Sequence, residues 1–184
     1  MSNLLLGVSG GIAAYKAADL ASKLTQRGDR VRTLMTPNAR EFITPLTFRA
    51  VTGEPVYTEV FSSNTAESME HISLGEWADA MVIAPATADL IGRLAGGLGG
   101  DIISTTCLAF TQPVLLAPAM NDRMWSHAIV QENLAALQTK LDYAVVEPEA
   151  GHLACGTVGP GRLAATEDII AAIDNLQTIE TPSG

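Results

Sequence analysis

Short apolar runs alternate with amphipathic stretches along almost the whole chain. The apolar runs cover residues 4–8, 31–35, 80–84, 114–117 and 144–146, and helical periodicity covers 12–26, 88–94, 128–138 and 166–176. Continuously apolar strands that alternate with helices are typical of a parallel sheet covered on both faces. The pattern therefore predicts an α/β fold of three layers, with helices on both faces of a mostly parallel, Rossmann-like sheet.

The length of 184 residues corresponds to one domain. We expect residues 1–176 to form that domain and residues 177–184 to be a tail or the start of a linker. The last helix begins with Thr-Glu-Asp at residues 166–168, so Thr166 is expected to cap it. Charged residues make up only 17% of the chain, below the ~25% of typical soluble domains, which indicates that partner subunits cover part of the surface.

The charge balance and the cysteines exclude several classes of protein. Eleven Lys and Arg against 20 Asp and Glu give a net charge of −9, which argues against binding to nucleic acid or to anionic lipid. No apolar run is long enough to cross a membrane, and no signal peptide is evident. Cys107 and Cys155 form neither a disulfide framework nor a metal-binding pair. We therefore expect a cytoplasmic protein without a metal.

Three segments depart from the alternation and are predicted to be loops. They are the polar, Ser-rich stretch 61–74, the stretch 92–101 with five glycines, and the stretch 147–164 with four glycines. Parallel α/β proteins keep their chemistry in the loops at the carboxyl ends of the strands. Function is therefore sought in the loops.

A further loop, residues 7–13, contains Gly7, Ser9, Gly10 and Gly11 between a predicted strand and a predicted helix. Glycines and a helix N-terminus suit an anion such as a phosphate, although an ordinary strand-to-helix turn also favours glycine. The second strand ends without the acidic residue that a dinucleotide's ribose requires, so a mononucleotide fits better. The residues that could bind it are Thr36 and Asn38 after that strand and Thr87 in the loop 85–89.

Other segments offer reactive side chains, each with an ordinary alternative. Asn121 could bind a carboxylate beside an apolar wall of methionine and tryptophan, or it could cap a helix, and the two remain equal. His71 can accept a proton near neutral pH, or it is a surface histidine, as His127 and His152 are taken to be. Cys155 lies on a glycine-rich loop that is either a substrate lid or merely mobile, whereas Cys107 is the buried, structural kind.

Taken together, these segments resemble the flavin-containing cysteine decarboxylase family, and in particular its branch in coenzyme A biosynthesis. The resemblance runs from about residue 4 to residue 176. It rests on the segments GVSGGIAAYK, HISL, IAPATADLIGRLAGG, PAMNDRMW and LACG-x-x-G-x-GRLA. It implies a homotrimer with active sites between subunits, assembled in some members into a dodecamer, and a phosphopantothenoylcysteine synthetase that is fused or separate.

The resemblance also implies roles for individual residues. His71 would be the essential histidine, Cys155 the proton donor, and Asn121, with Met124, would hold the substrate. The residue that binds the substrate's phosphate is not assigned, and the candidates are Arg93, Arg123 and Arg162. The residues implied to bind FMN are Ser9, Gly10, Gly11, Ile12, Thr36, Asn38, Thr87, Ala88, Asp89, Ala119 and Met120.

The implied reaction is the FMN-dependent decarboxylation of N-(4′-phosphopantothenoyl)-L-cysteine to 4′-phosphopantetheine and CO₂. Oxidation of the thiol carbon to a thioaldehyde gives decarboxylation an electron sink, and the resulting enethiol is then reduced with a proton from Cys155. Members of the family without that cysteine stop at the enethiol, so Cys155 selects the coenzyme A branch.

Two alternatives share the fold. A flavin prenyltransferase has a similar glycine-rich start, but the PAMN and LACG segments argue against it. Relatives that act as non-catalytic, phosphatase-inhibiting subunits typically lack part of the catalytic set. Because His71, Asn121 and Cys155 are present together, the decarboxylase is favoured.

Overall fold

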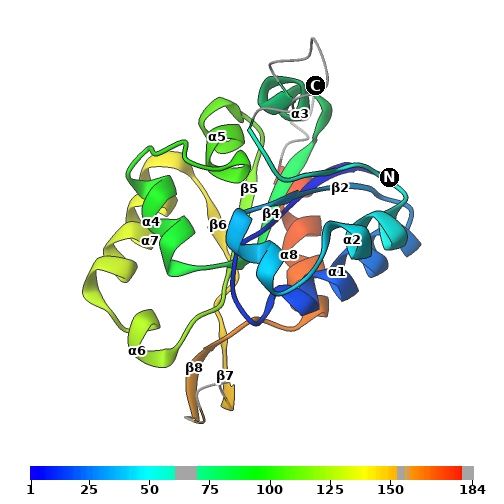
Figure 1. Ribbon diagram of the computed structural model, residues 1–184. Helices are drawn as coiled ribbons and strands as arrows, with labels where there is room; N and C mark the ends of the chain where they lie inside the picture. The colour runs from blue at the N-terminus through cyan, green and yellow to red at the C-terminus, as the bar shows by residue number, and fades with distance from the viewer. Residues whose placement is uncertain (61–69, 153–155, 157, 180–184) are drawn as a thin grey trace.

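The computed structural model describes residues 1–60, 70–152, 156 and 158–179 (Figure 1). Its centre is a six-stranded sheet of order β3-β2-β1-β4-β5-β6, in which all neighbouring strands are parallel. This confirms the predicted fold and all five predicted strands. The short strand β3 was not predicted, because two residues carry no periodicity. The strands are β1 (Asn3–Val8), β2 (Arg30–Met35), β3 (Val56–Tyr57), β4 (Ala80–Ala86), β5 (Val114–Pro118) and β6 (Ala144–Val145).

Helices cover both faces of the sheet. On one face lie α1 (Ala14–Gln26), α2 (Pro45–Thr52) and α8 (Thr166–Ile179). On the other face lie α3 (Glu70–Trp77), α4 (Ala88–Ala95), α5 (Ile102–Ala109) and α7 (Ala128–Leu141). Within the part of the chain that the structure describes, no helix has the length and apolar character needed to span a bilayer.

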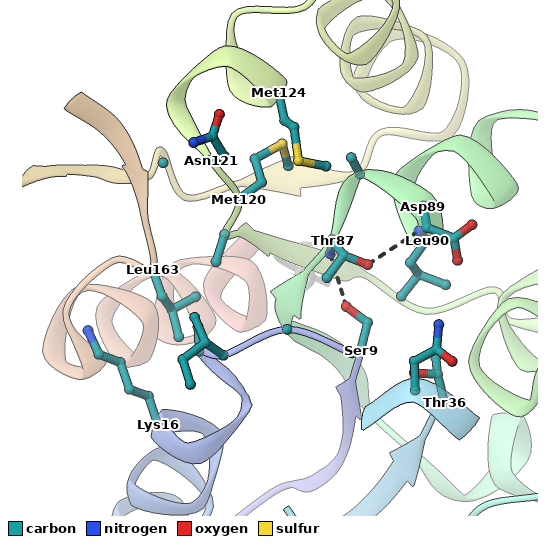
Figure 2. A pocket seen from close by; sticks show the side chains of 18 of the residues that line it. Ser9, Lys16, Thr36, Thr87, Asp89, Leu90, Met120, Asn121, Met124 and Leu163 are labelled. Atoms are coloured by element: carbon teal, nitrogen blue, oxygen red, sulfur yellow. Dashed lines mark hydrogen bonds between the residues drawn. The ribbon is translucent and has the colours of Figure 1, made fainter. Parts of the chain in front are cut away.

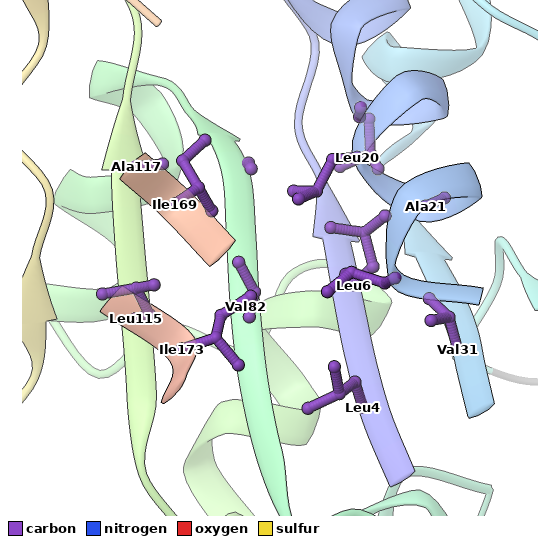
Figure 3. Packing of buried hydrophobic residues seen from close by; sticks show 14 of the residues in the cluster. Leu4, Leu6, Leu20, Ala21, Val31, Val82, Leu115, Ala117, Ile169 and Ile173 are labelled. Carbon is purple, nitrogen blue, oxygen red and sulfur yellow. The ribbon is translucent and has the colours of Figure 1, made fainter. Parts of the chain in front are cut away.

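The alternation of side chains along each strand builds the two cores. Leu4 and Leu6 of β1 pack in the core with α1 and α8 (Figure 3). Leu5 between them packs in the opposite core. All three are almost completely buried. Burying a leucine side chain contributes about 1.5–3 kcal/mol, so the apolar strands hold both helical layers to the sheet.

All three predicted loops contain some regular structure. The end of the segment 61–74 belongs to α3, which buries Leu74; residues 61–69 lie outside the described residues. The segment 147–164 contains an antiparallel hairpin of β7 (Glu149–His152) and β8 (Val158–Arg162). Glycines hide this hairpin from sequence inspection, because they cannot show hydrophobic alternation. The first part of the segment 92–101 likewise completes α4.

Both ends of α8 differ from expectation. Thr166 is the first helical residue rather than a cap, and its hydroxyl donates a hydrogen bond to Asp19 at 2.9 Å. The helix continues to Ile179 rather than ending at residue 176.

Candidate active site

A cavity of about 740 Å³ lies at the carboxyl edge of the sheet, at the ends of β1, β2, β4 and β5 (Figure 2). Such a volume suits a cofactor or substrate of drug-like size. All of the residues that the sequence nominated for FMN line it, and four of those nominated for the substrate do so too. The four are Asn121, Met124, Arg93 and Arg162.

The glycine-rich loop after β1 is held by its neighbours rather than being free. Ser9 is buried, and its hydroxyl donates to the carbonyl of Pro85 at 2.7 Å and accepts from the backbone N–H of Thr87 at 2.9 Å. A Cβ atom on Gly10 would stand 2.4 Å from the Cβ of Asn38. Gly10 is therefore required by close packing between two loops, and Ser9 ties a third loop to them.

Helix α1 directs an open N-terminus toward this cavity. Its N-cap is Ala13, which has no side chain able to accept a hydrogen bond from the first turn. Ala13 also lines the cavity. The N–H groups of Ala14 and Lys16 donate to the carbonyls of Gly11 and Ala13 at 2.9 and 3.0 Å, so this N-terminus favours an anion chiefly through the helix dipole. By contrast, Thr87 caps α4, where its hydroxyl accepts a long hydrogen bond of 3.5 Å from Leu90.

The loop after β5 contributes the apolar wall. Figure 2 shows the side chains of Met120 and Met124 side by side in the cavity, with Asn121 on the same loop. Asn121 is the N-cap of α6 (Asp122–Trp125), and its side chain accepts from the N–H of Arg123 at 2.9 Å. The capping alternative is thus present in the structure, and the same residue lines the cavity.

The β7–β8 hairpin docks tightly on that loop. The N–H of Met120 donates to the carbonyl of Gly161 at 2.8 Å. Gly161 has φ +131°, and a Cβ there would lie 2.2 Å from the carbonyl oxygen of Met120. A Cβ on Gly159 would similarly lie 3.0 Å from the Cβ of Asp122. Only glycine therefore allows the hairpin to form this wall of the cavity.

The charged side chains of the cavity differ in how far ion pairs and hydrogen bonds with their neighbours neutralise them. Arg93 donates to Asp89 at 2.9 Å, and this hydrogen bond raises the pKa of Arg93 above its ordinary value. Asp101, which is buried, accepts hydrogen bonds from the N–H groups of Ile103 and Ser104 and so caps α5. Among the described residues, Lys16 makes no ion pair, and it lines the cavity.

Sequence inspection missed several lining residues. Lys16 stands four positions after Ile12, and this spacing places both on one side of α1 and could have revealed it. Asp101, just before an apolar run, carried the signal of a helix cap. His152, expected to be an ordinary surface residue, is exposed but also lines the cavity; no sequence signal marks it.

Three nominated residues do not line this cavity in the described structure. Arg123 is exposed outside it, and Cys155 lies outside the described residues. His71 lies on α3, where its Nδ1 is buried without a hydrogen-bond partner. Gly75 of the same helix faces Ala109 at the far end of α5 from Asp101, so α3 lies away from the cavity (Figure 1).

Cys107 is the buried, structural cysteine that the sequence predicted. It is 8% exposed, and its sulfur lies 3.4 Å from the Sδ of Met81. Burial raises the pKa of its thiol to about 12, because the thiolate would lose its hydration. Cys107 is therefore unreactive near neutral pH.

A model of the flavoprotein family matches residues 1–178. The chain belongs to the flavoprotein family. This flavoprotein is 48% identical over 172 residues to the coenzyme A biosynthesis bifunctional protein CoaBC of Vibrio cholerae, covering 94% of the chain and 43% of that protein. The chain thus spans less than half the length of that relative.

Two solved structures are similar to this flavoprotein. One is a cysteine-to-serine mutant of PPC decarboxylase complexed with pantothenoylaminoethenethiol, with a TM-score of 0.85 and 30% identity, covering 96% of this chain and 98% of that one. The other is the FMN binding protein AtHal3, with a TM-score of 0.82 and 28% identity, covering 98% and 99%. The fold and the family therefore agree with the resemblance found in the sequence.

Proposed function

We propose that this chain is an FMN-dependent decarboxylase that converts 4′-phosphopantothenoylcysteine to 4′-phosphopantetheine and CO₂ in coenzyme A biosynthesis. One observation carries the proposal. The residues nominated for the flavin all line a single cavity, in a chain similar over 96% of its length to PPC decarboxylase. The similarity to CoaBC over 94% of the chain supports the same pathway.

The residues of the cavity fit FMN. The dipole of α1 and the backbone of the loop at Gly11 suit a phosphate, and Thr36 and Asn38 add polar groups. Ala119 and Met120 supply apolar surface for an isoalloxazine ring. FMN held there would supply a two-electron acceptor for oxidation of the thiol-bearing carbon and a donor for the final reduction.

On the substrate side, Asn121 holds the cysteinyl carboxylate by its amide and Met124 packs against the apolar part. Lys16 supplies a cation without an ion-pair partner among the described residues, for an anionic group of the substrate. Cys155, which lies outside the described residues, is proposed on the sequence resemblance as the donor of the final proton. In support, the similar mutant that lacks a cysteine was found with pantothenoylaminoethenethiol, an unsaturated thiol.

His71 completes the site from a neighbouring subunit of a homotrimer. Its own helix lies away from the cavity of the same chain, and its Nδ1 has no partner there. Apolar side chains are exposed both beside α3 (Ile72 and Leu108) and at the cavity (Ile12 and Tyr15). Contacts between these two surfaces would bury them and bring His71 to the substrate, where it accepts a proton during thiol oxidation. Four such trimers would form a dodecamer.

We also infer the extent of this domain and the enzyme that works with it. We infer that residues 1–176, together with the end of α8 up to Ile179, form one flavin-binding domain. Because the chain spans 43% of CoaBC, we infer that a phosphopantothenoylcysteine synthetase works with it, either fused or separate, in the cytoplasm.

The activity is tested by incubating the FMN-loaded protein with 4′-phosphopantothenoylcysteine and following CO₂ and 4′-phosphopantetheine by mass spectrometry. Both products are expected in equal amounts. Absence of both, with flavin bound and the oligomer intact, would reject the activity.

The shared site is tested by mixing two inactive variants, His71→Asn and Asn121→Leu, after dissociation and reassembly. Sites that combine an intact cavity with an intact His71 then form by chance, and about one quarter of the wild-type activity should return. Mixtures that stay inactive would show that each site uses the His71 of its own chain.

A further inference from the structure

Three arginines were candidates for the substrate's phosphate, and the structure separates them. Arg123 is exposed outside the cavity. Arg93 lines it, but the Nε of Arg93 donates to Asp89 at 2.9 Å and its charge is compensated. Arg162 also lines the cavity, and the described residues give it only an ion contact of 3.9 Å with Glu149, too long for a hydrogen bond. Arg162 therefore keeps its donors for a ligand.

The hairpin gives Arg162 its position. Arg162 pairs with Glu149 in the register of β7 and β8, beside the bulge at Gly161. Its Nη1 lies 3.2 Å from the point that a Cβ of Gly151 would occupy, so the guanidinium rests on the backbone of β7. The side chain is 48% exposed, although Gly161 next to it is buried against Met120. The arginine is therefore held by backbone and open to the cavity.

Glu149 does not fully neutralise the charge of Arg162, because one of its carboxylate oxygens accepts a hydrogen bond from another residue. Its Oε1 accepts a hydrogen bond from the N–H of Ala165 at 3.1 Å, which fixes the chain after β8. Only Oε2 faces Arg162, at 3.9 Å from Nε. The two terminal nitrogens of the guanidinium make no hydrogen bond with the described residues, and together they match two oxygens of a phosphate.

We propose that Arg162, on strand β8 of the hairpin, binds the phosphate of the substrate together with Lys16 on α1. The inference rests on the proposed function, which gives the substrate a phosphate at one end and the departing carboxylate at the other. A cation held on the carboxylate would stabilise the ground state that decarboxylation must leave. Charge on the remote phosphate instead contributes binding energy without opposing the reaction.

The test compares 4′-phosphopantothenoylcysteine with unphosphorylated pantothenoylcysteine as substrates of the FMN-loaded protein. Arg162→Met should lower kcat/KM for the phosphorylated substrate about 10- to 100-fold and leave the unphosphorylated one unchanged. Arg162→Lys should restore part of the loss, because charge remains without the planar fork. Lys140→Met, which removes an exposed charge at the end of α7, is the matched control and should change neither.

Glu149→Gln gives an effect of opposite sign. The amide keeps an oxygen for Ala165 but removes the negative charge beside Arg162, so kcat/KM for the phosphorylated substrate should rise about 2- to 5-fold. Fluorescence titration with FMN and with riboflavin identifies whose phosphate is bound. A weaker affinity of Arg162→Met for FMN, with that for riboflavin unchanged, would assign the arginine to the cofactor and overturn the proposal.

The remaining outcomes distinguish an error in the role of Arg162 from an error in the decarboxylase activity. Equal losses on both substrates would mean a structural role for Arg162, and no loss on either would mean no role; each overturns the proposal while leaving the decarboxylase intact. If the wild-type protein converts neither substrate, the proposed function itself fails, and the inference that rests on it fails too.

Discussion

Replacement of Gly161 by alanine tests how the hairpin is attached to the cavity. The added Cβ would stand 2.2 Å from the carbonyl oxygen of Met120, at a residue with φ +131°. A non-glycine residue at positive φ costs about 1–2 kcal/mol. Separation of the hairpin from the loop after β5 also removes the 2.8 Å hydrogen bond from the N–H of Met120 to the carbonyl of Gly161, which is worth about 1 kcal/mol. The docked hairpin should therefore lose about 2–3 kcal/mol.

Gly28→Ala is the matched control. Gly28 also has a positive φ, +103°, but nothing lies within 4 Å of its Cβ position. The control therefore measures backbone strain alone, expected at about 1–2 kcal/mol. Urea unfolding followed by circular dichroism gives both losses, and limited proteolysis reports undocking of the hairpin directly.

Gly161→Ala and Gly28→Ala should differ more in kcat/KM than in the free energy of unfolding. Misplacing a wall of the site by about 1 Å can cost a factor of about 100, so kcat/KM of Gly161→Ala should fall 10- to 100-fold, whereas Gly28→Ala should retain its activity. If both variants lose equal stability, and if Gly161→Ala keeps normal turnover and resistance to protease, the hairpin does not depend on this contact and the reasoning is wrong.

Three further predictions concern single side chains. Cys155→Ser should still release CO₂ but accumulate a product with two hydrogens fewer than 4′-phosphopantetheine, detected by mass spectrometry; normal product would remove Cys155 from the mechanism. His71→Asn should keep its flavin absorbance but fail to reduce the flavin when substrate is added anaerobically, and near-normal reduction would contradict its role. In the Cys155→Ser background, iodoacetamide at pH 8 should leave Cys107 unmodified until the protein is unfolded, because burial raises the pKa of its thiol to about 12; rapid labelling of the folded protein would contradict this.

Much of the site followed from local pattern. The runs at 4–8 and 80–84 predict two strands of a parallel sheet, whose carboxyl ends share one edge of the sheet. The loops of Ser9 and Thr87 were therefore expected at the same edge, and the structure joins these residues, 78 positions apart, by a hydrogen bond of 2.9 Å. The segment of His152 and Arg162 was harder to assign, because its glycines carry no periodicity and a hairpin was not expected.

The amino-acid sequence by itself determined which segments are buried strands and that the loops after them lie at one edge of the sheet, because apolar periodicity is a local property and parallel strands share their carboxyl edge. Tertiary structure alone decided that Asn38 packs so closely on residue 10 that only glycine fits there. It also decided that the guanidinium of Arg162, unlike that of Arg93, has no close carboxylate partner among the described residues, and that His71 lies away from the cavity of its own chain. These outcomes depend on contacts between distant segments, and such contacts exist only after helices and hairpin have docked on the sheet.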